Sequence, residues 1–131
     1  LELIAGIVEP GESVADVAYR EADEEAGMQL LALKPICQYH VSPGGSQEKI
    51  HLQCALMHSE GLGGFYGLAH EGEDIRALVM PRQQAYQAVL EGSINNAATI
   101  MALQWLELNQ VQLRAQWQPL LATRLAEGIR P

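Results

Sequence analysis

The sequence predicts a single α/β domain in which extended segments alternate with helices, and three features of the chain predict this class. Residues 1–8 form an apolar run of the kind found in a strand inside a sheet. A helical pattern follows, with a capping box at Ser13 and Asp16 and, at Gly27, a left-handed residue that ends the helix. Residues 50–56 place apolar side chains on one face, as a half-buried strand does.

The other extended segments complete this order of elements. Residues 30–41 are typical of a strand that is interrupted at Pro35, and the polar stretch 42–49 is a loop by composition. The glycine-rich segment 59–74 is too long and irregular for a hairpin turn, and long ordered loops are often functional. It leads into a short strand within residues 75–80.

Two further helices are expected after these strands. Pro81 suits the first turn of a helix that ends at Gly92, and Ser93 or Asn95 can cap a longer helix behind it. Residues 116–131 are weakly patterned, and we expect a loosely held tail there. The longer helix carries apolar side chains that we expect in the core, namely Ile100, Leu103, Trp105 and Leu106.

Length and composition indicate one domain, residues 1–131. The chain is 48% hydrophobic and 18% charged, which suits a globular fold with a modest core. It opens on an apolar run without an initiator methionine. We therefore expect a piece of a longer protein, truncated at its N-terminus.

The charge of the chain excludes some partners. Eight basic and sixteen acidic residues leave a net charge of -8, which argues against nucleic acid and anionic membranes. A phosphate-bearing ligand would need a cation between itself and these carboxylates. No apolar run approaches the roughly 18 residues of a spanning helix. Cys37 and Cys54 lack the spacing of a zinc site and suit reduced thiols in the cytoplasm.

The first helix carries carboxylates on its apolar face. At about 100° per residue, Glu21 and Glu25 fall in the middle of the apolar arc, with Glu24 at its margin beside Arg20. On a solvated face such glutamates would be ordinary. Facing the protein, two charges about 6 Å apart repel by roughly 3 kcal/mol at an effective dielectric constant near 20. The arc is formed by Val14, Val17, Ala18 and Ala22.

A bound divalent cation would relieve this repulsion. Magnesium prefers oxygen ligands from a few carboxylates and commonly bridges to substrate phosphates. Arg20 lies four residues before Glu24 and can hold that carboxylate by a charge-assisted bond. The helix therefore indicates a metal site.

These residues belong to a longer pattern, G-x5-E-x7-READEEAGM. The pattern resembles the Nudix box, the signature of hydrolases that act on nucleoside diphosphates linked to another group. It departs at Ala22, where the box usually has a bulky aliphatic residue. The matching positions are Gly6, Glu12, Arg20, Glu21, Glu24, Glu25 and Gly27.

The resemblance implies a Nudix α/β/α sandwich with a mixed sheet, and magnesium bound by the box glutamates, with Mn²⁺ able to substitute. The resemblance also implies that Glu24 and Arg20 are catalytic residues. Gly6 would leave a backbone carbonyl accessible as a further ligand. The implied metal ligands are Ala5, Glu21, Glu25 and Glu73.

Three stretches narrow the resemblance to the bacterial ADP-ribose pyrophosphatases: SPGG at 42–45, GLAHEGEDI at 67–75 and INNAATIMALQWL at 94–106. This implies cytoplasmic hydrolysis of ADP-ribose to AMP and ribose 5-phosphate by a homodimer. Glu71 would be the general base. The residues implied at the terminal ribose are Ser42, Gly44 and Glu48.

Other interpretations stay open. HEGED at 70–74 can be a solvated acidic loop without a catalytic role. The substrate can be another nucleoside diphosphate derivative. The domain can also be a nucleotide sensor that kept the fold and lost turnover, although such a sensor would be expected to have lost some of these carboxylates.

Overall fold

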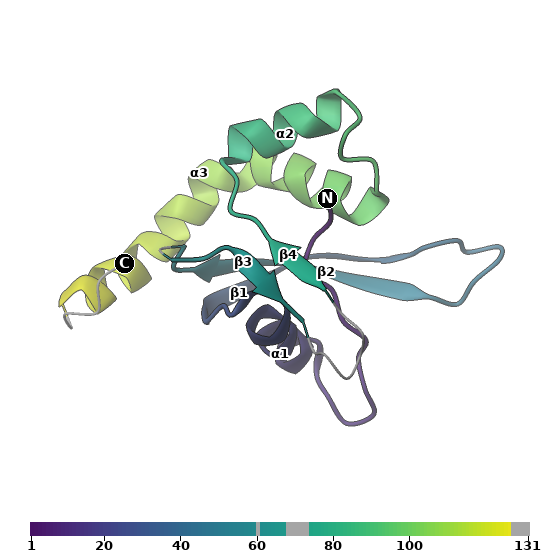
Figure 1. Cartoon of the computed structure of the whole chain (residues 1–131), viewed down its shortest axis with the longest axis horizontal. Helices are drawn as coiled ribbons and strands as arrows, with labels where there is room; N and C mark the ends of the chain where they lie inside the picture. The colour runs from purple at the N-terminus through teal and green to yellow at the C-terminus, as the bar shows by residue number, and fades with distance from the viewer. Residues whose placement is uncertain (60, 68–73, 127–131) are drawn as a thin grey trace.

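The computed structural model describes residues 1–59, 61–67 and 74–126. Seven elements follow one another in this part of the chain (Figure 1). The predicted α/β class is confirmed. In chain order the elements are α1 (Val14–Ala26), β1 (Leu30–His40), β2 (Lys49–Met57), β3 (Gly64–Tyr66), β4 (Ile75–Ala77), α2 (Arg82–Leu90) and α3 (Ala97–Ala126).

The strands lie between two helical layers. Figure 1 shows α1 on one side of the strands and α2 with α3 on the other. α1 contacts β1, β3 and β4, while α3 contacts β2. Within the described residues the strands pair as two separate antiparallel ladders, β1 with β2 and β3 with β4, so the parallel pairing of a mixed sheet is not formed among them.

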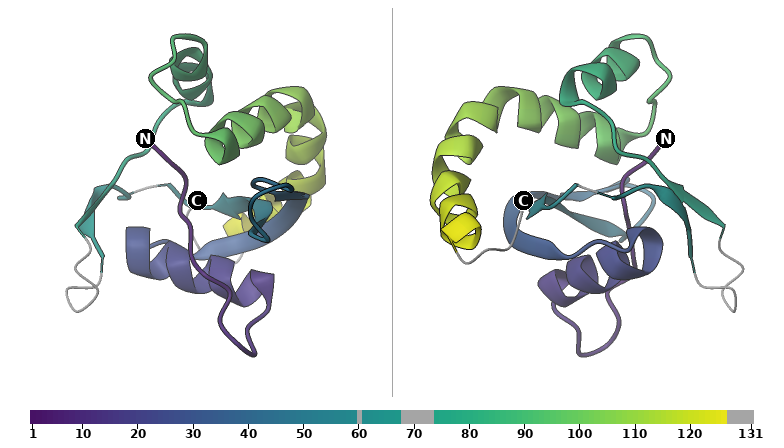
Figure 2. Two further views of the ribbon diagram at one scale, coloured as in Figure 1. Left: turned by 90° about the vertical axis from the view of Figure 1, so that its right-hand side faces the viewer. Right: turned by 60° about the vertical axis from the view of Figure 1, so that its left-hand side comes forward.

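Residues 1–8 do not form a strand, so that prediction was wrong. The segment is extended and exposed, and Figure 2 shows it crossing from the side of α2 and α3 to α1. Its hydrogen bonds to the rest of the chain are isolated: Leu1 O accepts from Asn96 at 2.9 Å, Ala5 N donates to Glu25 at 3.2 Å, and Ile7 O accepts from Arg20 at 3.3 Å. A strand needs a ladder of backbone bonds, and no neighbouring strand of the described chain supplies one.

β1 and β2 form a long hairpin whose tip is the predicted loop. Pro35 does not interrupt β1; it pairs with Gln53, and a bulge follows it before Cys37. A bulge lets the ladder continue past a residue without an N–H donor. The alternation predicted for β2 is confirmed, because Leu52 is buried while His51 is exposed.

The ends of α1 were predicted correctly. Ser13 and Asp16 form the capping box, in which Ser13 N donates to Asp16 at 2.9 Å and Asp16 N donates to Ser13 Oγ at 3.2 Å. Gly27 ends the helix in the left-handed conformation with φ 60°. The face of α1 that packs inward buries Val17, Ala22 and Ala26.

The cap gives a prediction for stability. Ser13→Ala should cost about 1 kcal/mol at pH 7 through the lost N-cap. The bonds from Ser13 hold the pKa of Asp16 below its ordinary value of 3.8. A lowered pKa stabilises the fold above pH 3.8, and the effect is lost as the pH falls through the folded-state pKa. Thermal unfolding should therefore show a difference between wild type and variant that narrows in acid.

A matched control is Ser59→Ala, which changes an exposed serine outside the helices and strands. It should leave the melting temperature within about two degrees at every pH, as most surface substitutions do. An equal melting temperature for Ser13→Ala and wild type at pH 7 would contradict the role of the cap.

The cap of α3 was predicted at the wrong residue. Asn96 caps this helix, because Thr99 N donates to Asn96 Oδ1 at 3.0 Å. Ser93 is engaged by the preceding helix, where its Oγ donates to Ala88 O at 3.1 Å. α3 then continues through Pro119 to Ala126, and the last residues of the expected tail, 127–131, lie outside the described chain.

The core lies where these helices meet the strands. α2 and α3 are joined by an ion pair between Arg82 and Glu107. The four residues expected in the core are each half-buried, and none of them is fully buried: Ile100, Leu103, Trp105 and Leu106. Among the described helices, none combines the length and the apolar character needed to cross a membrane. Outside α1, the buried apolar residues are Leu52, Ile94 and Leu113.

Candidate active site

α1 turns its glutamates inward, as the helical periodicity predicted. The side chain of Glu21 is 13% exposed and that of Glu24 is 30% exposed. Glu25 is also half-buried, whereas Asp23 and Tyr19 lie on the exposed side of the helix. Carboxylates therefore gather on the face of α1 that packs against the rest of the domain.

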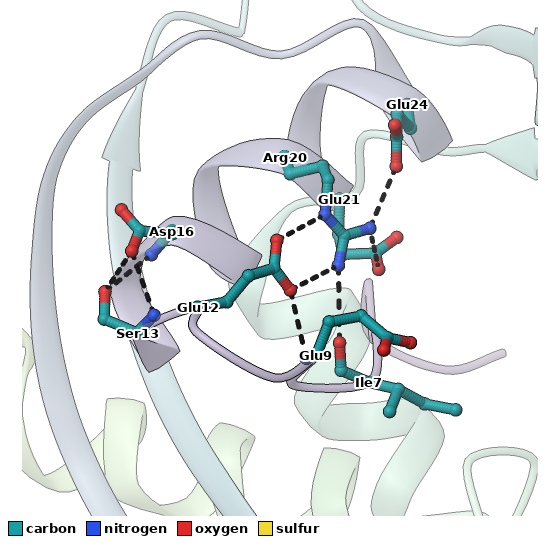
Figure 3. A network of polar contacts seen from close by, with 8 residues as sticks. All are labelled: Ile7, Glu9, Glu12, Ser13, Asp16, Arg20, Glu21 and Glu24. Carbon is teal, nitrogen blue, oxygen red and sulfur yellow. Dashed lines mark hydrogen bonds and ion pairs between the residues drawn. The ribbon is translucent and has the colours of Figure 1, made fainter.

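Arg20 binds three carboxylates at once (Figure 3). Its Nη1 donates to Glu21 Oε1 at 2.7 Å and to Glu24 Oε2 at 3.1 Å, so the predicted contact with Glu24 is confirmed. Its Nε and Nη2 donate to both oxygens of Glu12, at 3.0 and 3.2 Å, and Nη2 also donates to Ile7 O at 3.3 Å. One guanidinium thus holds α1 and the preceding turn together.

The charge of this cluster is reflected in its pKa values. Hydrogen bonds to Glu12 and Glu24, and then to Glu21, raise the pKa of Arg20. The bond from Arg20 in turn lowers the pKa of Glu12. Both groups keep their charge at neutral pH, so the arginine offsets part of the repulsion among the glutamates. The sequence patterns did not predict the ion pair of Glu12 with Arg20, although both residues are box positions.

The segment before α1 passes close to these carboxylates. Ala5 N donates to Glu25 Oε2 at 3.2 Å. A Cβ on Gly6 would overlap the carboxylate of Glu21, so only glycine lets the backbone approach this side chain. The structure thus brings together Ala5, Glu21 and Glu25, three of the four residues expected to bind metal.

The donors in this cluster suit a hard divalent cation. Carboxylate and carbonyl oxygens are the ligands that magnesium prefers. Within residues 1–59, 61–67 and 74–126, no three His, Cys, Asp or Glu side chains are grouped closely enough to hold an ion by themselves. Glu73, the fourth expected ligand, and Glu71, the expected base, lie outside the described residues.

The residues on either side of that segment lie at α1. Gly67 N donates to the backbone oxygen of Glu24 at 3.3 Å. Tyr66 pairs with Ile75 in the β3–β4 ladder, and both strands contact α1. The described residues on both sides of 68–73 therefore lie beside the helix that carries the glutamates.

The residues expected at the sugar lie elsewhere in the molecule. Ser42, Gly44 and Glu48 are exposed in the loop between β1 and β2. Ser42 O accepts bonds from the backbone of the same loop, and Val41 N donates to Glu48 O at 3.2 Å. Figure 1 shows this hairpin tip projecting away from α1. These three residues do not contact the α1 glutamates of the same chain, and their role at the ribose stays a prediction.

Comparison with known proteins finds a matching domain family and several relatives of this chain. The model of the NUDIX domain matches residues 1–126. The ADP-ribose pyrophosphatase of Escherichia coli K12 is 48% identical over 117 residues, which are 89% of this chain and 56% of the relative. That of Haemophilus influenzae is also 48% identical, over 90% of this chain and 54% of the relative.

A more distant relative has a different substrate in its name. The GDP-mannose pyrophosphatase of Cronobacter sakazakii is 32% identical over 85% of this chain and 57% of the relative. The chain thus spans about half the length of the curated relatives that it matches. The match over residues 1–126, together with the glutamates gathered on α1, shows that this chain belongs to the Nudix family.

Proposed function

We propose that the protein containing this chain hydrolyses the pyrophosphate bond of ADP-ribose, or of a related ADP-sugar, to AMP and a sugar phosphate; from ADP-ribose the second product is ribose 5-phosphate. One observation carries the proposal: the inward glutamates of α1, held by Arg20, occur in a chain 48% identical to two ADP-ribose pyrophosphatases. Sequence identity of this extent supports the substrate class, and the carboxylates support the chemistry.

Magnesium, with Mn²⁺ as a substitute, is the proposed cofactor. Its ligands would be the carboxylates of Glu21, Glu25 and Glu73 and the backbone carbonyl of Ala5. When bound, such ions neutralise the diphosphate and make a water molecule more acidic. The Nudix family is typically dependent on divalent metal, which agrees with the oxygen donors gathered on α1.

The protein's own groups then have separate tasks. Glu71 takes the proton of the attacking water as general base. Arg20 stays charged and holds the carboxylate of Glu24 in place, since its bonds to Glu12 and Glu24 raise its pKa. We propose that Ser42, Gly44 and Glu48 contact the terminal ribose.

The net charge of the chain and its free cysteines support a proposal about its location and partners. Both cysteines are free, Cys37 exposed and Cys54 half-buried, which suits the reducing cytoplasm. A net charge of -8 disfavours nucleic acid and anionic membranes as partners. We propose a homodimer for the intact protein, because the hairpin tip with Ser42 and Glu48 projects away from the glutamates of its own chain.

A second candidate is hydrolysis of another nucleoside diphosphate sugar, which the 32% identity to a GDP-mannose pyrophosphatase favours. A nucleotide sensor without turnover would have no need of the carboxylates, and Glu21, Glu24 and Glu25 are all present.

The test is phosphorus NMR of the intact protein with ADP-ribose and magnesium in ¹⁸O-labelled water. AMP and ribose 5-phosphate should form, with the label on one product, and turnover should stop in EDTA. ADP-glucose, NADH and GDP-mannose serve as comparison substrates. Full activity in EDTA would refute the metal role, faster release of GMP from GDP-mannose would favour the second candidate, and no turnover of any substrate would favour the sensor.

Gly6→Ala should impair the metal site. The new Cβ would overlap the Glu21 carboxylate and force it to move. Changing a group that orients a metal ligand typically costs about 10–100-fold in metal affinity or activity. Titration with Mn²⁺, followed by its electron paramagnetic resonance, should show weaker binding. Gly44→Ala, compared by Mn²⁺ titration alone and not by activity, is the control for backbone stiffness, since a Cβ there meets no atom within 4 Å. Equal Mn²⁺ affinity in wild type and Gly6→Ala would contradict the prediction.

A further inference from the structure

The last turn of α1 is tied to β3 by its backbone. Helix ends leave carbonyl groups without partners inside the helix. Two of them are bound locally, because Ala22 O accepts from Met28 N and Asp23 O from Gly27 N, each at 2.8 Å. The next carbonyl, that of Glu24, accepts instead from Gly67 N at 3.3 Å. Gly67 follows directly on β3, so this bond joins segments far apart in the sequence.

Tyr66 stands beside that bond and packs on the end of the helix. A Cβ built on Gly27 would lie 2.8 Å from Tyr66 Cε1, which is closer than ordinary contact, and 3.4 Å from Cζ. Gly27 is also left-handed, with φ 60°. The glycine that closes the Nudix box thus has two roles here: it turns the chain, and its missing side chain leaves room for the ring of Tyr66.

The neighbouring aromatic residue faces the other way. Side chains alternate between the two faces of a strand. Phe65 is 74% exposed, whereas Tyr66 is half-buried and packs against Gly27. The ring of Tyr66 therefore makes a contact between β3 and the end of α1, and Phe65 offers a neighbouring aromatic side chain that points away from it.

We propose that Tyr66 is a positioning residue for the hydrolysis, and this rests on the proposed function. Its ring, seated on Gly27, holds Gly67 N against the carbonyl of Glu24. The carboxylate of Glu24 is held by Arg20, so this residue is fixed at both its side chain and its backbone. The turn that carries Glu24 and Glu25 is thereby held at a set position relative to β3. A shift of about 1 Å in such a turn can cost on the order of 100-fold in rate.

The test compares Tyr66→Leu, Tyr66→Phe and Phe65→Ala in the intact protein. In Tyr66→Leu the amide of Gly67 should exchange its hydrogen at least about tenfold faster, measured by NMR without added metal or substrate. In the same variant kcat for ADP-ribose should fall about tenfold or more, with KM within about twofold. Tyr66→Phe keeps the ring and should restore both values. Phe65→Ala should match wild type.

Several outcomes would overturn the proposal. An unchanged exchange rate at Gly67 in Tyr66→Leu would show that the ring does not hold the Gly67 amide in place. An unchanged kcat would refute the positioning role. Equal losses in Tyr66→Phe and Tyr66→Leu would assign the effect to the hydroxyl and not to the ring. A wild type that does not hydrolyse ADP-ribose refutes the proposed function, a result distinct from the exchange at Gly67, which is measured without substrate.

Discussion

Replacing Glu25 with glutamine should lower kcat/KM for ADP-ribose by a factor on the order of 10²–10³. Glutamine keeps the size of the side chain and an oxygen that can accept the bond from Ala5 N, so the fold should persist. It lacks the charge that a magnesium ligand contributes, and each 1.36 kcal/mol of lost transition-state stabilisation is about tenfold in rate. Initial rates at saturating magnesium, together with circular dichroism of the variant, measure both parts of the prediction.

The matched control for this variant lies on the same helix. Asp23→Asn removes the same charge from the exposed side of α1 and should leave the rate within about twofold. Mn²⁺ binding should weaken in Glu25→Gln and stay constant in Asp23→Asn. Equal losses in both variants would mean that only the net charge of the helix matters, and a wild-type rate in Glu25→Gln would exclude it as a ligand.

Glu71→Gln should have an effect of similar or larger size through a different step. A positioned general base contributes about 10²–10⁴-fold, and glutamine cannot take a proton. Mn²⁺ affinity should therefore stay near that of wild type, in contrast to Glu25→Gln. The rate of wild type should rise with pH as the base loses its proton, and the variant should lose this limb of the profile. Initial rates of both proteins between pH 4 and 9 measure this difference in pH profile.

Asp74→Asn is the control for Glu71→Gln. It removes an acidic charge from the same stretch of chain at a position outside the proposed machinery, and it should keep the wild-type rate and pH profile. A Glu71→Gln protein with an unchanged pH profile would assign the base to another residue. A loss of Mn²⁺ affinity in Glu71→Gln would make this residue a ligand.

Much of α1 could be predicted from the sequence, because its determinants are local. The caps at Ser13 and Gly27 act within a few residues of the helix ends. The inward position of Glu21 follows from the period of the helix and from its alanine and valine neighbours. The salt bridge of Arg20 with Glu24 follows from their spacing of four residues.

Predictions that depended on distant partners were less successful. Residues 1–8 have the composition of a strand, but a strand also needs a neighbour for its backbone groups, and the described residues place none beside them. Asn96 caps α3 because Ser93 is engaged by the end of α2. Local preference allowed several caps, and contacts between neighbouring elements selected one.

The sequence by itself determined the span of α1, the face on which its glutamates lie and, through the box pattern, the family. Tertiary structure decided how other segments contact that helix. It placed Gly6 beside Glu21, Ala5 N within hydrogen-bond distance of Glu25, and the ring of Tyr66 against Gly27. It also placed the tip of the β1–β2 hairpin away from α1. The physical reason is the range of the forces involved. Helix caps and periodicity are set by neighbours along the chain, whereas contacts between distant segments exist only after the whole domain has packed.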